Sequence, residues 1–153
     1  MKKLSIYLVI IICLFITGCG SDKTRVAKTL DEFETAATGS GFSVTENEKY
    51  YSTTDYIIEA KIATYDEIEV EIIKYSDSET ASKVQEQHIE SFNLLKSTGA
   101  YAEKEKGSNY YDYALISNGR YMVSTRVDDT LIFAKVFIEE REMVESLINS
   151  LGY

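Results

Sequence analysis

His88 is the only histidine in the chain of 153 residues, and so it is the first candidate for a catalytic base or a metal ligand. Either task needs partners: a serine or cysteine nucleophile for acyl transfer, or further histidine and cysteine ligands for zinc. The sequence contains no G-x-S-x-G motif, no H-x-x-x-H pair and no C-x-x-C pair. We therefore expect a histidine packed at the edge of a core, with no catalytic residue, no metal and no cofactor.

Carboxylates form the densest row of polar groups. Glu67, Glu69 and Glu71 alternate with aliphatic residues, which is typical of a strand with one solvated face. Glu59 and Lys61 lie on the preceding predicted strand and are expected to face this row as cross-strand partners. Carboxylate oxygens suit Ca²⁺, but the sequence has no D-x-D-x-D-G loop to wrap an ion. The row therefore predicts a solvated sheet face.

Tyrosine is the compositional oddity, with 12 residues in the chain. Six of them form two local clusters, which are Tyr50, Tyr51 and Tyr56, and Tyr110, Tyr111 and Tyr113. Amphipathic aromatic rings are enriched at binding surfaces, so these clusters are a possible surface for a sugar, peptide or protein. The alternative is that tyrosine serves here as a good strand former with a polar end.

Two arginines share one predicted strand. Arg120 and Arg126 are expected on the face opposite Tyr121 and Val123, because side chains alternate along a strand. They could receive an anionic ligand, but the abundance of acidic residues favours pairing with nearby carboxylates.

The amino terminus has the layout of an export signal. Lys2 and Lys3 precede an apolar run over residues 4–16. A helix of this length would span about 20 Å, whereas a bilayer core is about 30 Å thick. The segment is therefore short for a transmembrane helix and is typical of a secretory signal.

The residues that follow, Ile16-Thr17-Gly18-Cys19, resemble the lipobox of bacterial lipoproteins. That resemblance implies a diacylglycerol on the Cys19 thiol, cleavage just before this cysteine, and attachment to the outer face of the cell membrane. It predicts a signal peptide over 1–18, a lipidated cysteine and linker over 19–25, and one domain over 26–153. The alternatives are an ordinary cleaved signal peptide and an uncleaved signal anchor. In outline, the rest of the chain resembles small uncharacterised lipoproteins of Gram-positive bacteria, a likeness that implies no activity.

The charge of the chain excludes some partners. Of 16 Lys and Arg residues, two lie in the leader, which leaves 14 basic against 25 acidic residues, a net charge of 14 − 25 = −11. Nucleic acid would need clustered Lys and Arg, and is therefore not expected as a partner.

The elements that would position these groups can be read from periodicity and turn signals. Helices are expected at 24–38, for about twenty residues after Ser76, and at about 140–151; strands are expected at 42–45, 56–64, 66–75, 110–117, 120–127 and 131–138, with a weak strand after Tyr101 and a hairpin turn at Asn118-Gly119. This order predicts an α+β fold, with an antiparallel sheet, helices on one face and a possible α-β-β-β pseudo-repeat.

For function, these observations favour a non-enzymatic, membrane-tethered binding or accessory module whose partner is an envelope protein or polymer. Two alternatives stay open: a cell-envelope hydrolase that uses carboxylates, and an inhibitor or immunity-like protein. A pocket holding two carboxyl groups with raised pKa would favour the hydrolase.

Overall fold

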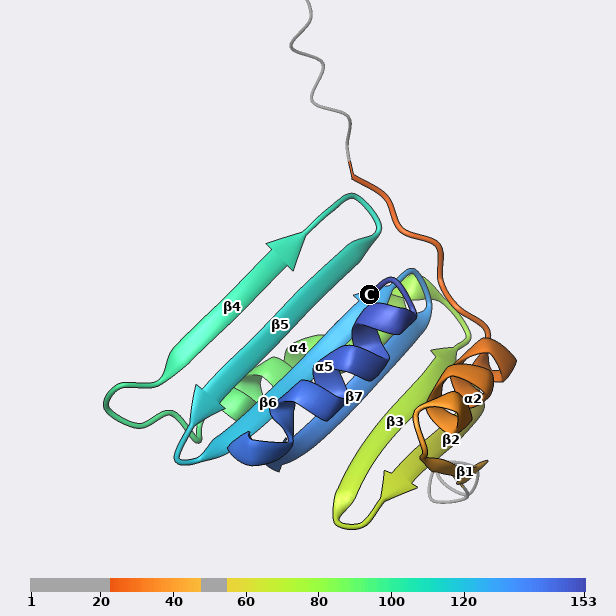
Figure 1. The fold of residues 1–153 in the computed structure, drawn as a ribbon. Coiled ribbons are helices and arrows are strands. Elements are labelled where there is room, and N and C mark those ends of the chain that lie inside the picture. The colour runs from red at the N-terminus through yellow and green to blue at the C-terminus, as the bar shows by residue number, and fades with distance from the viewer. Residues whose placement is uncertain (1–22, 48–54) are drawn as a thin grey trace, which may run out of the picture.

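The computed structural model describes residues 23–47 and 55–153. Within them, seven antiparallel strands form one sheet in the order β1-β2-β3-β7-β6-β5-β4 (Figure 1). The strands are β1 (Ser43–Glu46), β2 (Ile57–Tyr65), β3 (Ile68–Tyr75), β4 (Tyr101–Lys106), β5 (Tyr110–Ser117), β6 (Arg120–Val127) and β7 (Thr130–Phe137). The helices are α2 (Leu30–Gly39), α4 (Ser78–Asn93) and α5 (Arg141–Ser150), with a 3-10 turn, η1 (Ile138–Glu140), before α5. The prediction of an α+β fold with an antiparallel sheet is confirmed.

Two-residue turns hold the central strands together. Asn118 and Gly119, between β5 and β6, have φ angles of 53° and 68°. Positive φ at both positions is what a type I′ turn requires, and this predicted hairpin is confirmed. Asp66 and Asp128 begin the equally short β2–β3 and β6–β7 turns, with φ angles of 53° and 50°. Aspartate and asparagine adopt this conformation more readily than other residues with a Cβ atom.

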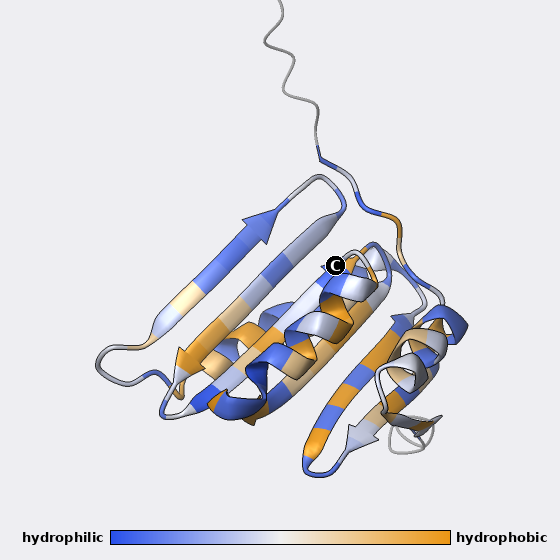
Figure 2. Cartoon of the chain, viewed as in Figure 1, coloured by the Kyte–Doolittle hydropathy of each residue, from blue (hydrophilic) through white to orange (hydrophobic). Residues whose placement is uncertain are grey.

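Helices cover both faces of the sheet. Helices α2 and α5 share one face, and α4 lies behind the other (Figure 1). The prediction that all helices share one face is therefore wrong. Adjacent side chains of a strand point to opposite faces, and in β3 Ile72 packs under α2 and α5, whereas Ile73 packs near α4. Figure 2 shows the hydrophobic residues gathered on the central strands and on the inward sides of the helices. Because both faces of the sheet carry apolar side chains, helices must cover both faces.

The succession α-β-β-β occurs twice, as α2-β1-β2-β3 and as α4-β4-β5-β6, so the predicted repeat is confirmed for the order of elements. Strands β3 and β6 both run antiparallel to β7, which lies between them, and they are therefore parallel to each other. A half-turn about the axis of β7 brings one strand order onto the other and exchanges the two faces. This relation accounts for the positions of α2 and α4 on opposite faces.

Capping residues decide where two helices begin. Helix α2 begins at Leu30 instead of residue 24 because Thr29 forms a capping box: its side chain accepts from the Glu32 amide at 3.2 Å, and the Glu32 carboxylate accepts from the Thr29 amide at 2.9 Å. Residues 23–29 form neither helix nor strand, and Val26 is 79% exposed. Helix α4 is capped by Asp77, because the Asp77 carboxylate accepts from the Thr80 amide at 2.7 Å.

None of the helices in the described part of the chain is both long and apolar enough to cross a membrane.

Candidate functional site

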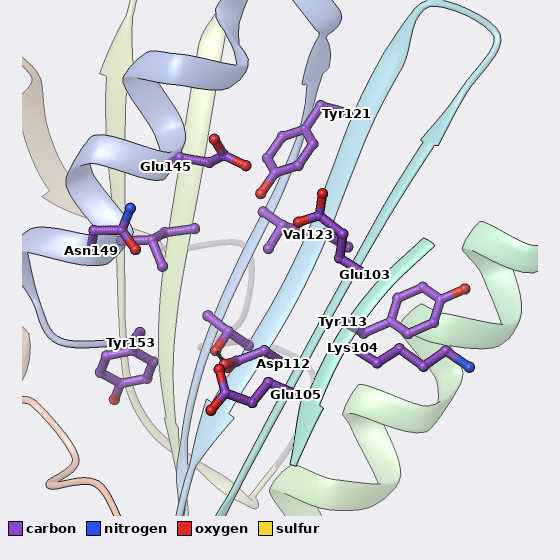
Figure 3. Close-up of a pocket in the computed structure, with 13 residues that line it drawn as sticks. Glu103, Lys104, Glu105, Asp112, Tyr113, Tyr121, Val123, Glu145, Asn149 and Tyr153 are labelled. Atoms are coloured by element: carbon purple, nitrogen blue, oxygen red, sulfur yellow. Dashed lines mark hydrogen bonds between the residues drawn. The ribbon is translucent and has the colours of Figure 1, made fainter. Parts of the chain in front are cut away.

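A groove of about 440 Å³ lies on the face that α5 shares, between this helix and strands β4, β5 and β6 (Figure 3). The register of the strands builds its floor in two rows, in which Glu103 lies beside Ala114 and Glu105 lies beside Asp112. Each row ends on β6, at Val123 and Thr125 respectively. Helix α4 covers the opposite face of β5 and β6. On the face that α5 shares, polar side chains of β4, β5 and β6 line the groove.

Carboxylates from three elements converge on this groove, which we call the carboxylate groove; they are Glu103 and Glu105 from β4, Asp112 from β5 and Glu145 from α5 (Figure 3). Tyr121 and Tyr153 form parts of its wall, whereas Lys104 and Tyr113 point away toward α4 (Figure 3).

An arginine binds the carboxylates at one end of the groove. Arg141, the first residue of α5, places Nη2 3.1 Å from Glu103 and Nε 2.6 Å from Glu145. Its guanidinium lies 5.3 Å from the centre of the Tyr121 ring. The hydrogen bond with Glu145 raises the pKa of Arg141, and burial raises the pKa of the Tyr121 hydroxyl. Both groups therefore keep their ordinary protonation state, and this end of the groove holds a fixed ion-pair network.

A second arginine binds the carboxylates at the other end. Arg25 places Nη1 2.6 Å from Asp112 and Nη2 3.4 Å from Glu105, and its guanidinium lies 3.9 Å from the centre of the Tyr110 ring. The Tyr110 hydroxyl donates to Glu105 at 2.8 Å. That hydrogen bond, with one from Lys23, lowers the pKa of Glu105.

The contacts of Glu105 and Asp112 differ from those expected of a carboxyl group that acts as a general acid. A general acid needs a carboxyl group whose pKa is raised by burial or by a like charge. Here the pKa of Glu105 moves in the opposite direction, and Asp112 is held by Arg25 and by a hydrogen bond from Thr125. Within residues 23–47 and 55–153, no group of three or more His, Cys, Asp or Glu residues could hold a metal ion.

The predicted tyrosine surface is not formed by the described tyrosines. Tyr110 and Tyr113 are each only 1% exposed, and they point to opposite faces of β5. Tyr113 packs against Phe92 of α4, and its hydroxyl donates to Asn93. The strand carries its tyrosines into two cores instead of onto one exposed face, because both faces of β5 are partly covered. Tyr111 is half-buried on the α4 face.

The first tyrosine cluster contributes a single described residue. Tyr56 is 42% exposed and stacks on Tyr75, with ring centres 6.3 Å apart. Tyr50 and Tyr51 lie outside the described residues, as do the lipobox residues Ile16, Thr17, Gly18 and Cys19.

His88 is packed, as predicted. Its ring lies 4.4 Å from the ring of Phe133, and Nδ1 lies 3.4 Å from Oγ of Ser124. Burial lowers the pKa of His88 to about 4, so the ring is neutral near pH 7. Ser124 is fully buried, so its hydroxyl is not exposed to a substrate, whereas His88 is half-buried.

The three glutamates of the predicted row do not form one solvated strand face. Glu67 lies in the β2–β3 turn, Glu69 is exposed, and Glu71 is 7% exposed beside Ile62 of the neighbouring strand. Lys61 points to the other face of the sheet, where its Nζ lies 3.1 Å from Asp31 and 2.7 Å from Glu34 of α2. The expected pairing of Lys61 with the row is therefore wrong, because the register places Lys61 beside Ile72.

The two predicted arginines do lie on the face opposite Tyr121, but their contacts differ from the expected carboxylate pairs. The Arg120 guanidinium lies 3.9 Å from the centre of the Phe137 ring. Arg126 donates to the Gln85 side chain at 3.3 Å and to the Asp128 carbonyl at 3.0 Å.

Sequence reasoning missed the groove and both of its arginines. The signals were weak: Glu103 and Glu105 alternate along one short strand, and Arg141 and Glu145 are one helical turn apart. Arg25 was assigned to a helix and to the linker, and nothing near it in the sequence points to Asp112.

A scan against protein-family models and a search of curated proteins each gave no match to this chain. Among solved structures, the chain is similar to a GTP binding regulator from Thermotoga maritima, with 19% identity and a TM-score of 0.47. The similarity covers 82% of this chain and 89% of the other.

Proposed function

We propose that this protein is a lipid-anchored, extracytoplasmic binding or accessory module, attached through Cys19 and binding its partner in the carboxylate groove. The lipobox-like residues support the anchor. The observation that supports binding is the groove itself, in which Glu103, Glu145, Glu105 and Asp112 are held in fixed positions by Arg141 and Arg25. Side chains held in this way present a defined pattern of charge to a partner at a low entropic cost.

The same contacts make a hydrolase the weaker hypothesis. Paired catalytic carboxyl groups must include one that is protonated near neutral pH. Tyr110 and Lys23 lower the pKa of Glu105, which keeps this group ionised. An ionised, hydrogen-bonded carboxylate is suited to receiving a cationic or hydrogen-bond-donating group of a partner.

The test is site-specific photo-cross-linking in intact bacterial cells. A photoreactive amino acid replaces Asn149, an exposed residue of α5 that lines the groove. The matched control replaces Gln87, an exposed residue of α4 on the other face of the sheet. We expect one dominant partner to be cross-linked from position 149 and not from position 87. Equal products from both positions, or none from position 149, would overturn the groove as the binding surface.

The anchor is tested in the same cells. The Cys19→Ala variant should leave the membrane fraction and lose the cross-link, because no thioether can form. A variant that stays in the membrane fraction as the wild type does would show that residues 4–16 act as a signal anchor. Hydrolysis of an envelope polymer by the purified protein would instead favour the enzyme hypothesis.

A further inference from the structure

The segment of residues 23–29, which we call the strap, is bound to the domain at several points. The Arg25 amide donates to the Asn109 side chain at 3.0 Å, and that side chain donates back to the Arg25 carbonyl at 2.8 Å. The Ser108 amide donates to the Lys23 carbonyl at 3.2 Å. Farther along, the Lys28 amide donates to the Tyr153 hydroxyl at 3.2 Å. The strap therefore begins at the β4–β5 turn and follows the end of the sheet to α2 (Figure 1).

Three features make the strap an integral part of the fold instead of a loose linker. Its Arg25 side chain is held by Asp112 and by the Tyr110 ring. Ala27 packs against the core under α2 and α5. Gly107 has no side chain, and a Cβ atom there would overlap both the Tyr110 ring and the Lys23 carbonyl. Lys23 and Arg25, which the prediction placed in the linker, are therefore bound to the folded domain.

The strap also closes one end of the carboxylate groove, since Arg25 binds Glu105 and Asp112 from the groove's own lining. The position of the strap and the position of the groove are thus fixed relative to each other by the same three side chains.

Docking of the strap shortens the tether to the membrane. From Cys19 to Lys23 there are 23 − 19 = 4 residue steps, which reach at most about 14 Å when fully extended. Without docking, the tether would extend to Leu30, with 30 − 19 = 11 steps and a reach of about 40 Å. Each central strand has 8 residues and is therefore about 27 Å long. The short tether holds one end of the sheet near the membrane, whereas the long tether would let the domain turn over.

From this we infer that the strap holds the end of the groove formed by Arg25, Glu105 and Asp112 beside the membrane, so that the groove's partner lies in the membrane-proximal layer. The inference rests on the proposed lipid anchor at Cys19. On this inference the partner is a membrane protein and not an envelope polymer located farther from the bilayer.

The experiment measures energy transfer from two ends of the domain to the bilayer surface. The lipidated mature chain is purified from membranes and placed in phosphatidylcholine vesicles that contain a headgroup-labelled acceptor lipid. A donor dye is attached to one introduced cysteine, which is the only free thiol when Cys19 is lipidated and the leader is removed. Lys106→Cys labels the strap end, and Glu139→Cys labels the opposite end; both positions are exposed.

We expect strong transfer from position 106 and weaker transfer from position 139. The double variant Arg25→Ala and Asn109→Ala releases the strap and should make the two efficiencies nearly equal. Equal transfer from both positions with the wild-type strap would overturn the inference.

Failure of the inference is distinguishable from failure of the anchor. A chain that does not associate with vesicles would overturn the lipid anchor, and with it the proposed membrane role of the strap. A chain that associates with vesicles but exchanges its Arg25 amide hydrogen as fast as an unfolded peptide would overturn the docked strap alone.

Discussion

In each α-β-β-β unit of this protein the unit's own helix covers one face of the strands, and a groove forms on the other face of the second unit. In the first unit, α2 covers one face; on the other face Ile62 and Glu71 lie side by side, and Ile73 packs against α4. In the second unit, α4 covers one face; on the other face Glu105 and Asp112 lie side by side. A half-turn about β7 relates the two units, so the strands alone do not explain why only the second unit has a groove on this face.

The difference comes from the elements that have no counterpart in the repeat. Helix α5 follows β7 and packs beside the open face of the second unit, where it supplies Arg141 and Glu145. The strap precedes α2 and supplies Arg25 at the other end. The corresponding face of the first unit is covered in part by α4, a helix of the repeat itself. A symmetric scaffold therefore gains its candidate site from the two segments that break its symmetry.

The largest expected effect tests whether the two units form one cooperative core. Phe33 of α2 and Phe92 of α4 are 0% and 1% exposed. Replacing either phenylalanine with alanine should lower the free energy of unfolding by about 3–5 kcal/mol, because it removes buried apolar contacts and leaves a cavity. The measurement is urea denaturation followed by circular dichroism. Each variant should unfold in a single transition; two separate transitions would show that the units unfold independently.

The next effect is a pH dependence of stability that arises where α4, which carries His88, packs on the sheet. Burial lowers the pKa of His88 to about 4, below its ordinary value of 6.5. Between pH 6.5 and pH 4 the unfolded chain therefore binds a proton that the folded chain does not, so stability falls as the pH falls through this window. The loss should reach about 3 kcal/mol near pH 4.

The His88→Leu variant is the control for this pH effect, because leucine cannot bind a proton while the carboxyl groups titrate in both proteins. Denaturation midpoints measured from pH 7.5 to pH 4 should decline less steeply for the variant than for the wild type. Parallel curves would show that His88 does not carry the pH dependence.

A smaller loss of stability is expected when the strap is displaced from the domain. The Gly107→Ala variant should displace the strap, since a Cβ atom at this position overlaps Tyr110 and the Lys23 carbonyl. We expect a loss of about 1–3 kcal/mol and faster amide hydrogen exchange at Arg25. Gly39 of α2 has no neighbour within 4 Å of such a Cβ atom, so Gly39→Ala is the matched control. Equal exchange at Arg25 in both variants would contradict the docked strap.

The smallest effect concerns the ion pairs of α5. Arg141 has a side-chain exposure of 27%, and its pairs with Glu103 and Glu145 are open to solvent. The Arg141→Gln variant should therefore lose no more than about 1 kcal/mol of stability. The same variant should weaken cross-linking from position 149, because Glu103 and Glu145 would no longer be held in place. Strong destabilisation with unchanged cross-linking would assign Arg141 to the fold and not to the site.

Local patterns predicted the features that depend on neighbouring residues. Asn118 and Gly119 predicted a hairpin turn because a type I′ turn needs two adjacent residues that tolerate positive φ. Periodicity predicted a helix at about 140–151 because a helical stripe is a property of one segment. In α5 the buried residues are Val144, Leu147 and Ile148. His88 was expected to be packed because no catalytic partner accompanies it.

Features that depend on distant residues were not predictable in the same way. Arg25 lies 87 residues from Asp112 along the chain, and only the docked strap brings them together. Tyr110 and Tyr113 looked like a surface cluster because their spacing gave no indication that β5 would be covered on both faces.

By itself, the sequence determined the order and type of the elements, the tight turns of the central strands and the resemblance of Ile16-Thr17-Gly18-Cys19 to a lipobox. These are local properties, set by side-chain periodicity, by allowed φ angles and by short motifs. The tertiary structure alone decided which face each helix covers, that residues 23–29 are bound to the sheet, and that carboxylates from β4, β5 and α5 meet in one groove. Those features depend on the order of strands in the sheet and on its register, which set the contacts between segments that are far apart in the sequence.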